Sequence, residues 1–493
     1  MNQEFPVSGE SSPWSKREIV VLLLLFLGTA VTLGFRLGQA TPTIAAEIRC
    51  WKVVSTMTRT GEWLVPYRDG SPALNKPPLF YWAGAATGLL AGGASYATLR
   101  APSVIAALGV FLLTYIWARS IGGPKLALVS AGLIALMRQF YGLGREGTFE
   151  MMLALFANAA LLTFDRTYWS GRRSLAPLLC LLIAAAFLTK GPPALLIVGV
   201  PIVLFLGFRR QIRLMLTWPV ALWAAATLLL SLLWFGVVLY RVPGAWDRFF
   251  SEAVLPLGIE SAHDTAKHYH HLFYFFSRFV VITPFASLLL PLVVWRGWQT
   301  RFWRDGPRLR FCAWIAVGLL VAFSLFPQKQ PHYLLPLFPA LVILTADAAL
   351  WAADVRSKVY WAWLGLPSVA LGIATVVAVV PLVFYFHVLL QVPLGSVVAL
   401  CAIVALLGSA IVWFGAKREW PATGIAILLA AWLLFSIYFG NYGILRSQFE
   451  TGEIEQRADY DKAHWAQVKK SYPFVGKILH RGSRFMKDKP EKK

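Results

Sequence analysis

The sequence predicts an all-α polytopic membrane protein, a bundle of about 13 transmembrane helices. Apolar residues fill 58% of the 493 positions, charged residues fill 14%, and the mean hydropathy is +0.61. A soluble domain carries about a quarter charged residues, so this composition indicates a chain that lies largely in lipid. The net charge of +22 is spread between apolar stretches. It therefore indicates topology signals and contact with lipid phosphates, and no nucleic-acid partner.

The helical spans are placed by the positive-inside rule. About twenty apolar residues cross a bilayer, and short cytoplasmic loops collect Lys and Arg. If residues 1–18 are cytoplasmic, every basic loop cluster also falls inside. The first apolar stretch is too long for a signal peptide and is predicted to be a span. Spans are expected near 19–35, 101–118, 126–142, 149–165, 174–189, 192–207, 215–241, 272–295, 311–326, 333–351, 359–385, 395–415 and 422–443.

Residues 78–95 are apolar, yet counting them as a span would place two basic clusters outside. They are predicted to form a re-entrant or surface-lying helix, with an ordinary span as the alternative. The transmembrane domain is then 19–444, with juxtamembrane helices in a first periplasmic loop at 37–100. The short polar tail, 445–493, is expected outside although it is basic. The four cysteines form no disulfide framework or metal pair.

Ionisable residues gather at the predicted outer ends of the spans. Glu150 starts a span and is followed by Met151 and Met152. A carboxylate entering hydrocarbon is costly and usually functional, although a helix N-terminus also favours an acid. Arg145 and Glu146 precede it in the same external turn. Glu47 lies in the first external loop, where an amphipathic lid with incidental charges is the alternative.

Several cations share this face. Lys190 lies in the tight turn at 188–193, which favours anion binding over a lysine that only extends to the membrane surface. Lys329, His332 and Tyr333 share a second external turn, while Arg49 and Lys76 lie in the first loop. His268, His270 and His271 lack the carboxylate or cysteine partners of a metal site. They are interpreted as acceptor or phosphate contacts. No metal or cofactor is predicted, with a divalent metal left open.

This arrangement suits a phosphorylated donor and a nucleophilic acceptor. A sugar on a polyprenyl phosphate has an anionic leaving group, which needs positive charge rather than a general acid. An acceptor hydroxyl needs a base, which Glu47 or Glu150 could supply. An acceptor phosphate is already ionised and depends less on a base.

Over about residues 20–350 the chain resembles the GT-C polyprenyl-phosphate-sugar glycosyltransferases, specifically the bacterial lipid A aminoarabinose transferases and protein O-mannosyltransferase-like proteins. The resemblance rests on the order and spacing of GEWLVP at 61–66, KPPLFYW at 76–82, LTKGP at 188–192 and FSLFPQKQPHYLLPLFPAL at 323–341. The family usually has Asp-Glu at the first acidic site, where this chain has Ala46 and Glu47. Glu150 stands where an Asp is usual, and Asn75 replaces the Glu before Lys76.

The resemblance implies an enzyme of the bacterial inner membrane with its site facing the periplasm. It would move a sugar from a polyprenyl-phosphate donor to lipid A, a polysaccharide or a protein. A transporter or flippase of lipid-linked sugars is a rival, but it should carry charges near the bilayer midplane and show related halves. A catalytically inactive relative that binds the donor without transferring the sugar is a second alternative. The predicted roles are catalytic for Glu47 and Glu150, donor-phosphate binding for Arg49, Lys76, Lys190, Lys329 and His332, and acceptor contact for Arg145, Glu146, His268, His270, His271 and Tyr333.

Overall fold

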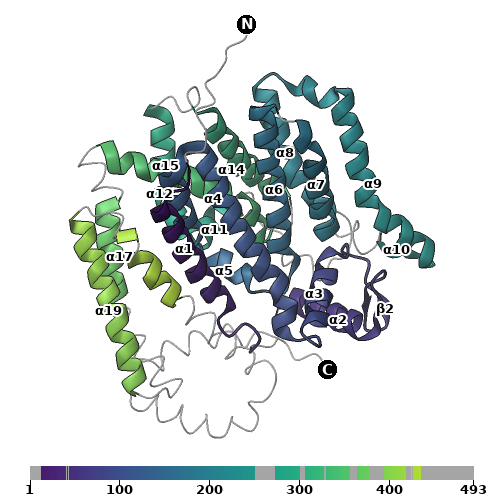
Figure 1. The fold of residues 1–493 in the computed structure, drawn as a ribbon, viewed down its shortest axis with the longest axis horizontal. Helices are drawn as coiled ribbons and strands as arrows, with labels where there is room; N and C mark the ends of the chain where they lie inside the picture. Colours follow the sequence, from purple (N-terminus) through teal and green to yellow (C-terminus); the bar gives the residue numbers. More distant parts are fainter. Residues whose placement is uncertain are drawn as a thin grey trace.

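The computed structural model describes residues 13–39, 42, 44–171, 173–249, 273–299, 306–326, 329–355, 364–377, 394–417, 423–424 and 426–434. Long apolar helices lie side by side in a bundle (Figure 1). The long helix α4 covers Tyr96–Ile134. The helices after it are α5 (Arg138–Gly144), α6 (Phe149–Ser170), α7 (Ala176–Lys190), α8 (Pro193–Phe208), α9 (Trp218–Arg241), α10 (Ala245–Phe249), α11 (Tyr274–Ile282), α12 (Pro284–Gln299), α14 (Pro307–Leu325), α15 (Phe338–Val355), α17 (Leu366–Val377) and α19 (Leu394–Ala416), with 3-10 turns η1 (Arg173–Leu175), η2 (Ile212–Leu216) and η6 (Pro331–Leu337).

The multi-pass membrane architecture is confirmed. Among the described residues, six helices are long and apolar enough to cross a bilayer, or seven if the bent pair α5–α6 is one broken span. That pair turns through 113° between its halves. Helices α7 and α8, at the expected spans 174–189 and 192–207, have 15 and 16 residues and fall below this length. The expected spans at 359–385 and 422–443 lie partly outside the described residues. The total of about 13 spans therefore stays a prediction.

Two helices begin with reciprocal caps that the sequence encodes locally. In α1 (Lys16–Gly34), the Ser15 hydroxyl accepts a hydrogen bond from the amide of Glu18, whose carboxylate accepts one from the amide of Ser15. The helix α4 (Tyr96–Ile134) starts in the same way at Ser95. Within α4 the backbone breaks at Gly122 and Gly123, the latter with φ of +75°. This break lies in the basic loop that was expected between the second and third spans.

The apolar segment 78–95 contains only the short helix α3 (Leu79–Leu90). At 1.5 Å per residue its 12 residues reach about 18 Å, which is less than the hydrocarbon thickness of about 30 Å. Its interpretation as a surface or re-entrant helix fits this length. A Cβ on Gly84 would lie 2.9 Å from Val54 of α2 (Ala45–Thr60), so glycine permits the close approach of the two helices.

The elements of the first loop collect at one end of the bundle. Helices α2 and α3 lie there beside a small hairpin, whose strands are β1 (Tyr67–Arg68) and β2 (Ser71–Pro72) (Figure 1). Elsewhere in the bundle, Glu18 of α1 pairs with Arg119 of α4 at 2.7 Å, and Asp165 of α6 pairs with Arg308 of α14 at 2.5 Å. The groups expected on the cytoplasmic side therefore contact one another, far along their helices from the first loop.

Candidate functional site

The clearest charge cluster is centred on Glu150, in the first turn of α6. Its Oε2 lies 2.5 Å from the Nζ of Lys190, and its Oε1 lies 3.4 Å from the Nε2 of His332. The side chains of Glu150, Lys190 and His332 are 13%, 12% and 23% exposed, so they are largely buried but still accessible to a ligand. The structure thus brings together three predicted residues that come from α6, the end of α7 and the start of η6.

Local sequence places Lys190 at the last position of α7. The chain turns at Gly191, whose φ of +80° suits glycine, and Pro192 follows as the N-cap residue of α8, which begins at Pro193. A cation at a helix C-terminus is stabilised by the helix dipole. The Lys190 ammonium also lies 5.4 Å from the ring centroid of Tyr333, within the range of a cation–π contact. Tyr333 therefore joins this cluster.

Lys76 lies next to the cluster, in the turn before α3. Burial lowers the pKa of its ammonium, the charge of Lys190 lowers the pKa further, and Glu150 opposes this shift. Two lysines face one carboxylate, which leaves one net positive charge. Such a partly desolvated cationic site is suited to an anion.

The other two predicted phosphate ligands, Lys329 and Arg49, lie on different segments of the chain. Lys329 is 3% exposed, and its Nζ donates a hydrogen bond to the carbonyl of Phe326 at 2.6 Å, just before η6. Arg49 is exposed on α2, and its charge contributes to the lowered pKa of Lys76. Glu146 is half-buried in the turn between α5 and α6. The three predicted histidines at 268, 270 and 271 lie outside the described residues.

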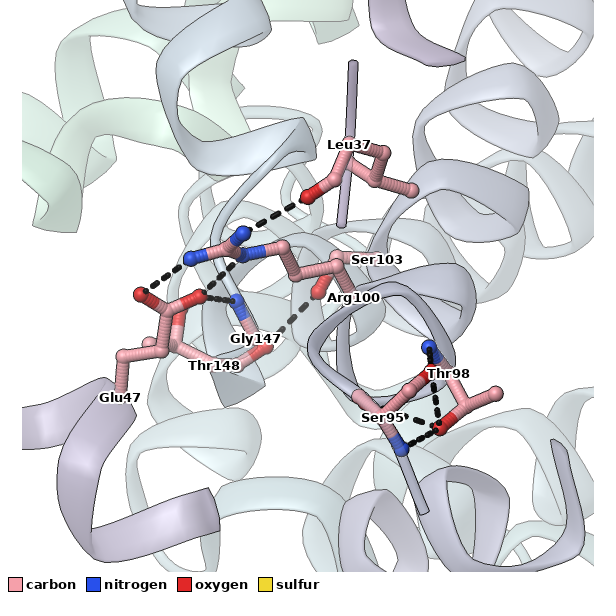
Figure 2. A network of polar contacts seen from close by, with 8 residues as sticks. All are labelled: Leu37, Glu47, Ser95, Thr98, Arg100, Ser103, Gly147 and Thr148. Atoms are coloured by element: carbon pink, nitrogen blue, oxygen red, sulfur yellow. Dashed lines mark hydrogen bonds and ion pairs between the residues drawn. The ribbon is translucent and has the colours of Figure 1, made fainter. Parts of the chain in front are cut away.

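Glu47, expected to act beside Glu150, is engaged in a separate network (Figure 2). Arg100 donates to both of its carboxylate oxygens, at 2.7 Å and 3.1 Å, and the amide of Gly147 donates to Oε1 at 2.8 Å. Both charged side chains are buried, with Glu47 3% and Arg100 6% exposed. Glu47 therefore has no carboxylate oxygen without a hydrogen-bond partner.

Arg145, predicted to contact the acceptor, binds the end of α1 in this structure. Its guanidinium donates to the carbonyls of Thr32, Leu33 and Phe35 at 2.9, 2.6 and 2.6 Å. The last carbonyls of a helix have no intrahelical partner, so a nearby arginine satisfies them. These contacts fix the α5–α6 turn against α1.

Sequence reasoning missed Arg100. The signal was present, because an arginine at the start of a long apolar helix is costly and has a partner by default. The partner could not be read from the chain, since Glu47 lies 53 positions away.

An apolar cavity of about 430 Å³ adjoins the end of α7. Phe187 and Pro192, on either side of Lys190 in the chain, line it together with Leu74. The remaining lining residues are Leu232, Trp234, Phe235, Gly236, Val238, Leu239, Ala245 and Trp246 of α9 and α10. The cavity would accept an apolar chain close to the charged cluster.

Residues 75–234 match the family model described as dolichyl-phosphate-mannose-protein mannosyltransferase. The undecaprenyl phosphate-alpha-4-amino-4-deoxy-L-arabinose arabinosyl transferase of Serratia proteamaculans is 28% identical over 404 residues, which cover 79% of this chain and 66% of that protein. The transferase of the same name from Aeromonas salmonicida is 31% identical over 312 residues, which cover 62% of this chain and 55% of that protein. The chain therefore spans about half to two thirds of the length of these relatives.

Solved structures show the same fold. ArnT from Cupriavidus metallidurans aligns with a TM-score of 0.65 in the apo state, with 20% identity over 89% of this chain and 78% of that one. Its complex with undecaprenyl phosphate aligns equally well, at 19% identity. The Archaeoglobus fulgidus oligosaccharyltransferase tethered with an acceptor peptide gives a TM-score of 0.50 at 16% identity, covering 92% and 59% of the two chains. The expected resemblance is confirmed: the chain is a multi-pass membrane protein of the GT-C fold, similar in sequence and structure to undecaprenyl phosphate-aminoarabinose arabinosyl transferases.

Proposed function

We propose that this chain is an inner-membrane glycosyltransferase that uses a polyprenyl-phosphate sugar at the periplasmic face. The observation that carries the proposal is the cluster of Glu150, Lys190 and His332, with Lys76 beside it and an apolar cavity adjoining it. One charged headgroup site and one apolar chain site thus lie side by side. The names of the relatives favour an undecaprenyl-phosphate aminoarabinose donor. The resemblance to lipid A aminoarabinose transferases makes lipid A the first acceptor to test.

Lys190 and Lys76 would bind the donor phosphate, and the cavity between α7 and α9 would accept the adjoining isoprene units. A charged hydrogen bond to a phosphate is about twice as strong as a neutral one. In the donor-free protein the Lys190 ammonium is paired with Glu150. A bound phosphate would compete with Glu150 for the Lys190 ammonium and so weaken this ion pair.

Transfer requires one bond to form as another breaks. The acceptor oxygen attacks the anomeric carbon, and the bond from that carbon to the phosphate oxygen breaks with its electron pair. Polyprenyl phosphate then leaves as an anion that the lysines stabilise. The proton of an acceptor hydroxyl would pass to Glu150, whose Oε1 lies 3.4 Å from the Nε2 of His332.

The test is turnover by the purified chain in lipid nanodiscs, with a panel of undecaprenyl-phosphate sugars and lipid A as acceptor. Glu150→Gln removes the base and should lower kcat at least about a hundredfold. Glu62→Gln, which changes an exposed glutamate of the first loop, is the matched control and should stay near wild type. Donor binding without transfer, equal in wild type and Glu150→Gln, would contradict the enzyme and favour a lapsed relative or a carrier.

A further inference from the structure

We infer that Glu47, paired with Arg100, is a positioning residue that holds the α5–α6 turn and, through it, the carboxylate of Glu150. This inference rests on the proposed function and changes the role expected for Glu47 from base to support. The network joins four segments that are distant in sequence: the chain after α1, α2, α4 and the turn before α6 (Figure 2).

Glu47 cannot easily act as a base in this arrangement. A carboxylate has about four lone-pair directions, and three accept hydrogen bonds here, two of them from a guanidinium. The side chain is 3% exposed. A general base has to come within hydrogen-bond distance of the acceptor proton, and Glu47 could do so only if this buried pair separated.

The turn that Glu47 binds holds one backbone hydrogen bond, from the amide of Thr148 to the carbonyl of Glu146 at 2.8 Å, but α6 has no side-chain cap from its own N-cap residue. Thr148 is the N-cap residue of α6, yet its hydroxyl makes no cap hydrogen bond and has no partner among the described residues. The start of α6 is instead fixed from outside. Glu47 accepts from the amide of Gly147 at 2.8 Å, and Ser103 donates to the carbonyl of Thr148 at 3.2 Å.

The turn is also tightly packed against α4. A Cβ on Gly147 would lie 2.5 Å from Cγ of Leu99, so the backbone of the turn lies directly on this helix. Arg100 follows Leu99 and also donates to the carbonyl of Leu37 at 2.7 Å. Glu150 comes three residues after Gly147, in the first turn of α6, so its position depends on these contacts.

The experiment compares Glu47→Gln with the double substitution Glu47→Gln/Arg100→Gln. The single change leaves a buried guanidinium without its counter-charge, whereas the double change removes both charges and allows amide hydrogen bonds. Glu47→Gln should lower kcat about tenfold to a hundredfold, as a small misplacement of the reacting groups does. The donor KM should stay within about twofold, because both phosphate-binding lysines remain. The double substitution should recover most of the lost kcat.

A matched control lies further along α4, which carries both Arg100 and Arg119. Glu18 and Arg119 form a similarly buried pair at 2.7 Å, and the double substitution Glu18→Gln/Arg119→Gln removes it. This control should change thermal stability without changing kcat by more than about twofold. It separates a local effect on the turn from general loss of stability.

Hydrogen exchange of residues 145–152 gives a readout that does not need activity. Exchange there should rise in Glu47→Gln and return towards wild type in the double variant. A double variant as inactive as Glu47→Gln would overturn the inference, because the carboxylate itself would then be required. Unchanged kcat and unchanged exchange in Glu47→Gln would overturn it as well. If the wild type transfers no sugar, the proposed function fails, and the exchange data alone decide whether Glu47 positions the turn.

Discussion

Replacing Lys190 with alanine tests the phosphate site most directly. The substitution removes an ammonium that lies 2.5 Å from Glu150 and 5.4 Å from the ring centroid of Tyr333. We expect a weaker hold on the donor, seen as a raised donor KM. The acceptor dependence should change little, because Lys190 is assigned to the leaving group.

The expected rise in the donor KM follows from the attraction between Lys190 and the donor phosphate, reduced by the weakening of the Lys190–Glu150 pair. Two unit charges 4 Å apart attract by about 4 kcal/mol at an effective dielectric constant of about 20. The net value of a hydrogen bond to a charged group is smaller, about 1.5–3 kcal/mol. Lys190 is already paired with Glu150 in the free protein, and that pair is weakened when phosphate binds. The lower end therefore applies, and at about 1.4 kcal/mol per tenfold change the donor KM should rise about tenfold.

The same substitution leaves Glu150 without its nearest cation. Breaking a buried ion pair costs about 3–5 kcal/mol of stability, but these side chains are 12% and 13% exposed and His332 remains at 3.4 Å. The loss should therefore lie below that range. Lys190→Ala/Glu150→Gln removes both charges and should recover part of the thermal stability.

The assay is the initial transfer rate against donor concentration, together with direct binding of undecaprenyl phosphate. Lys190→Arg keeps the charge and should fall between wild type and Lys190→Ala. A folded Lys190→Ala protein with unchanged donor KM and unchanged undecaprenyl phosphate affinity would refute the reasoning. Lys190 would then serve Glu150 alone.

Three further predictions concern pH, packing and topology. Burial and the charge of Lys190 lower the pKa of Lys76, so its ammonium loses its proton at a lower pH than an ordinary lysine, whose pKa is about 10.4. The donor KM should therefore rise as the pH increases towards that value. Lys76→Arg stays protonated and should flatten the rise, and an equal rise in both proteins would contradict the prediction. A Cβ on Gly28 would lie 2.3 Å from the ring of Trp432, so Gly28→Ala should cost about 1–3 kcal/mol in thermal unfolding. Adding Trp432→Ala should reduce that loss, and full additivity would count against the contact. A thiol reagent that cannot cross the membrane should modify Glu62→Cys from the periplasm and Arg213→Cys from the cytoplasm. Background labelling should be low because the four native cysteines are buried. The reverse pattern would contradict the predicted orientation.

Composition and local pattern were sufficient for the fold class. A transmembrane span needs a long run of apolar residues, and the Lys and Arg content of a loop indicates whether the loop is cytoplasmic. Both signals lie in consecutive residues of the sequence. The placement of the basic loops also predicted that 78–95 is not an ordinary span, and the 12-residue length of α3 fits this prediction. The break near 122–123 fell in an expected loop because glycine and proline act on the local backbone.

The tertiary structure decided which charges meet. Glu150 pairs with Lys190 across 40 positions, and Glu47 pairs with Arg100 across 53. The two glutamates look alike in the sequence, because both are predicted to lie on the outer face of the membrane. Helix packing brings one towards lysines that remain partly exposed and encloses the other against an arginine and a backbone amide. A buried charge requires a partner, but which partner it finds depends on the helix ends that lie next to it.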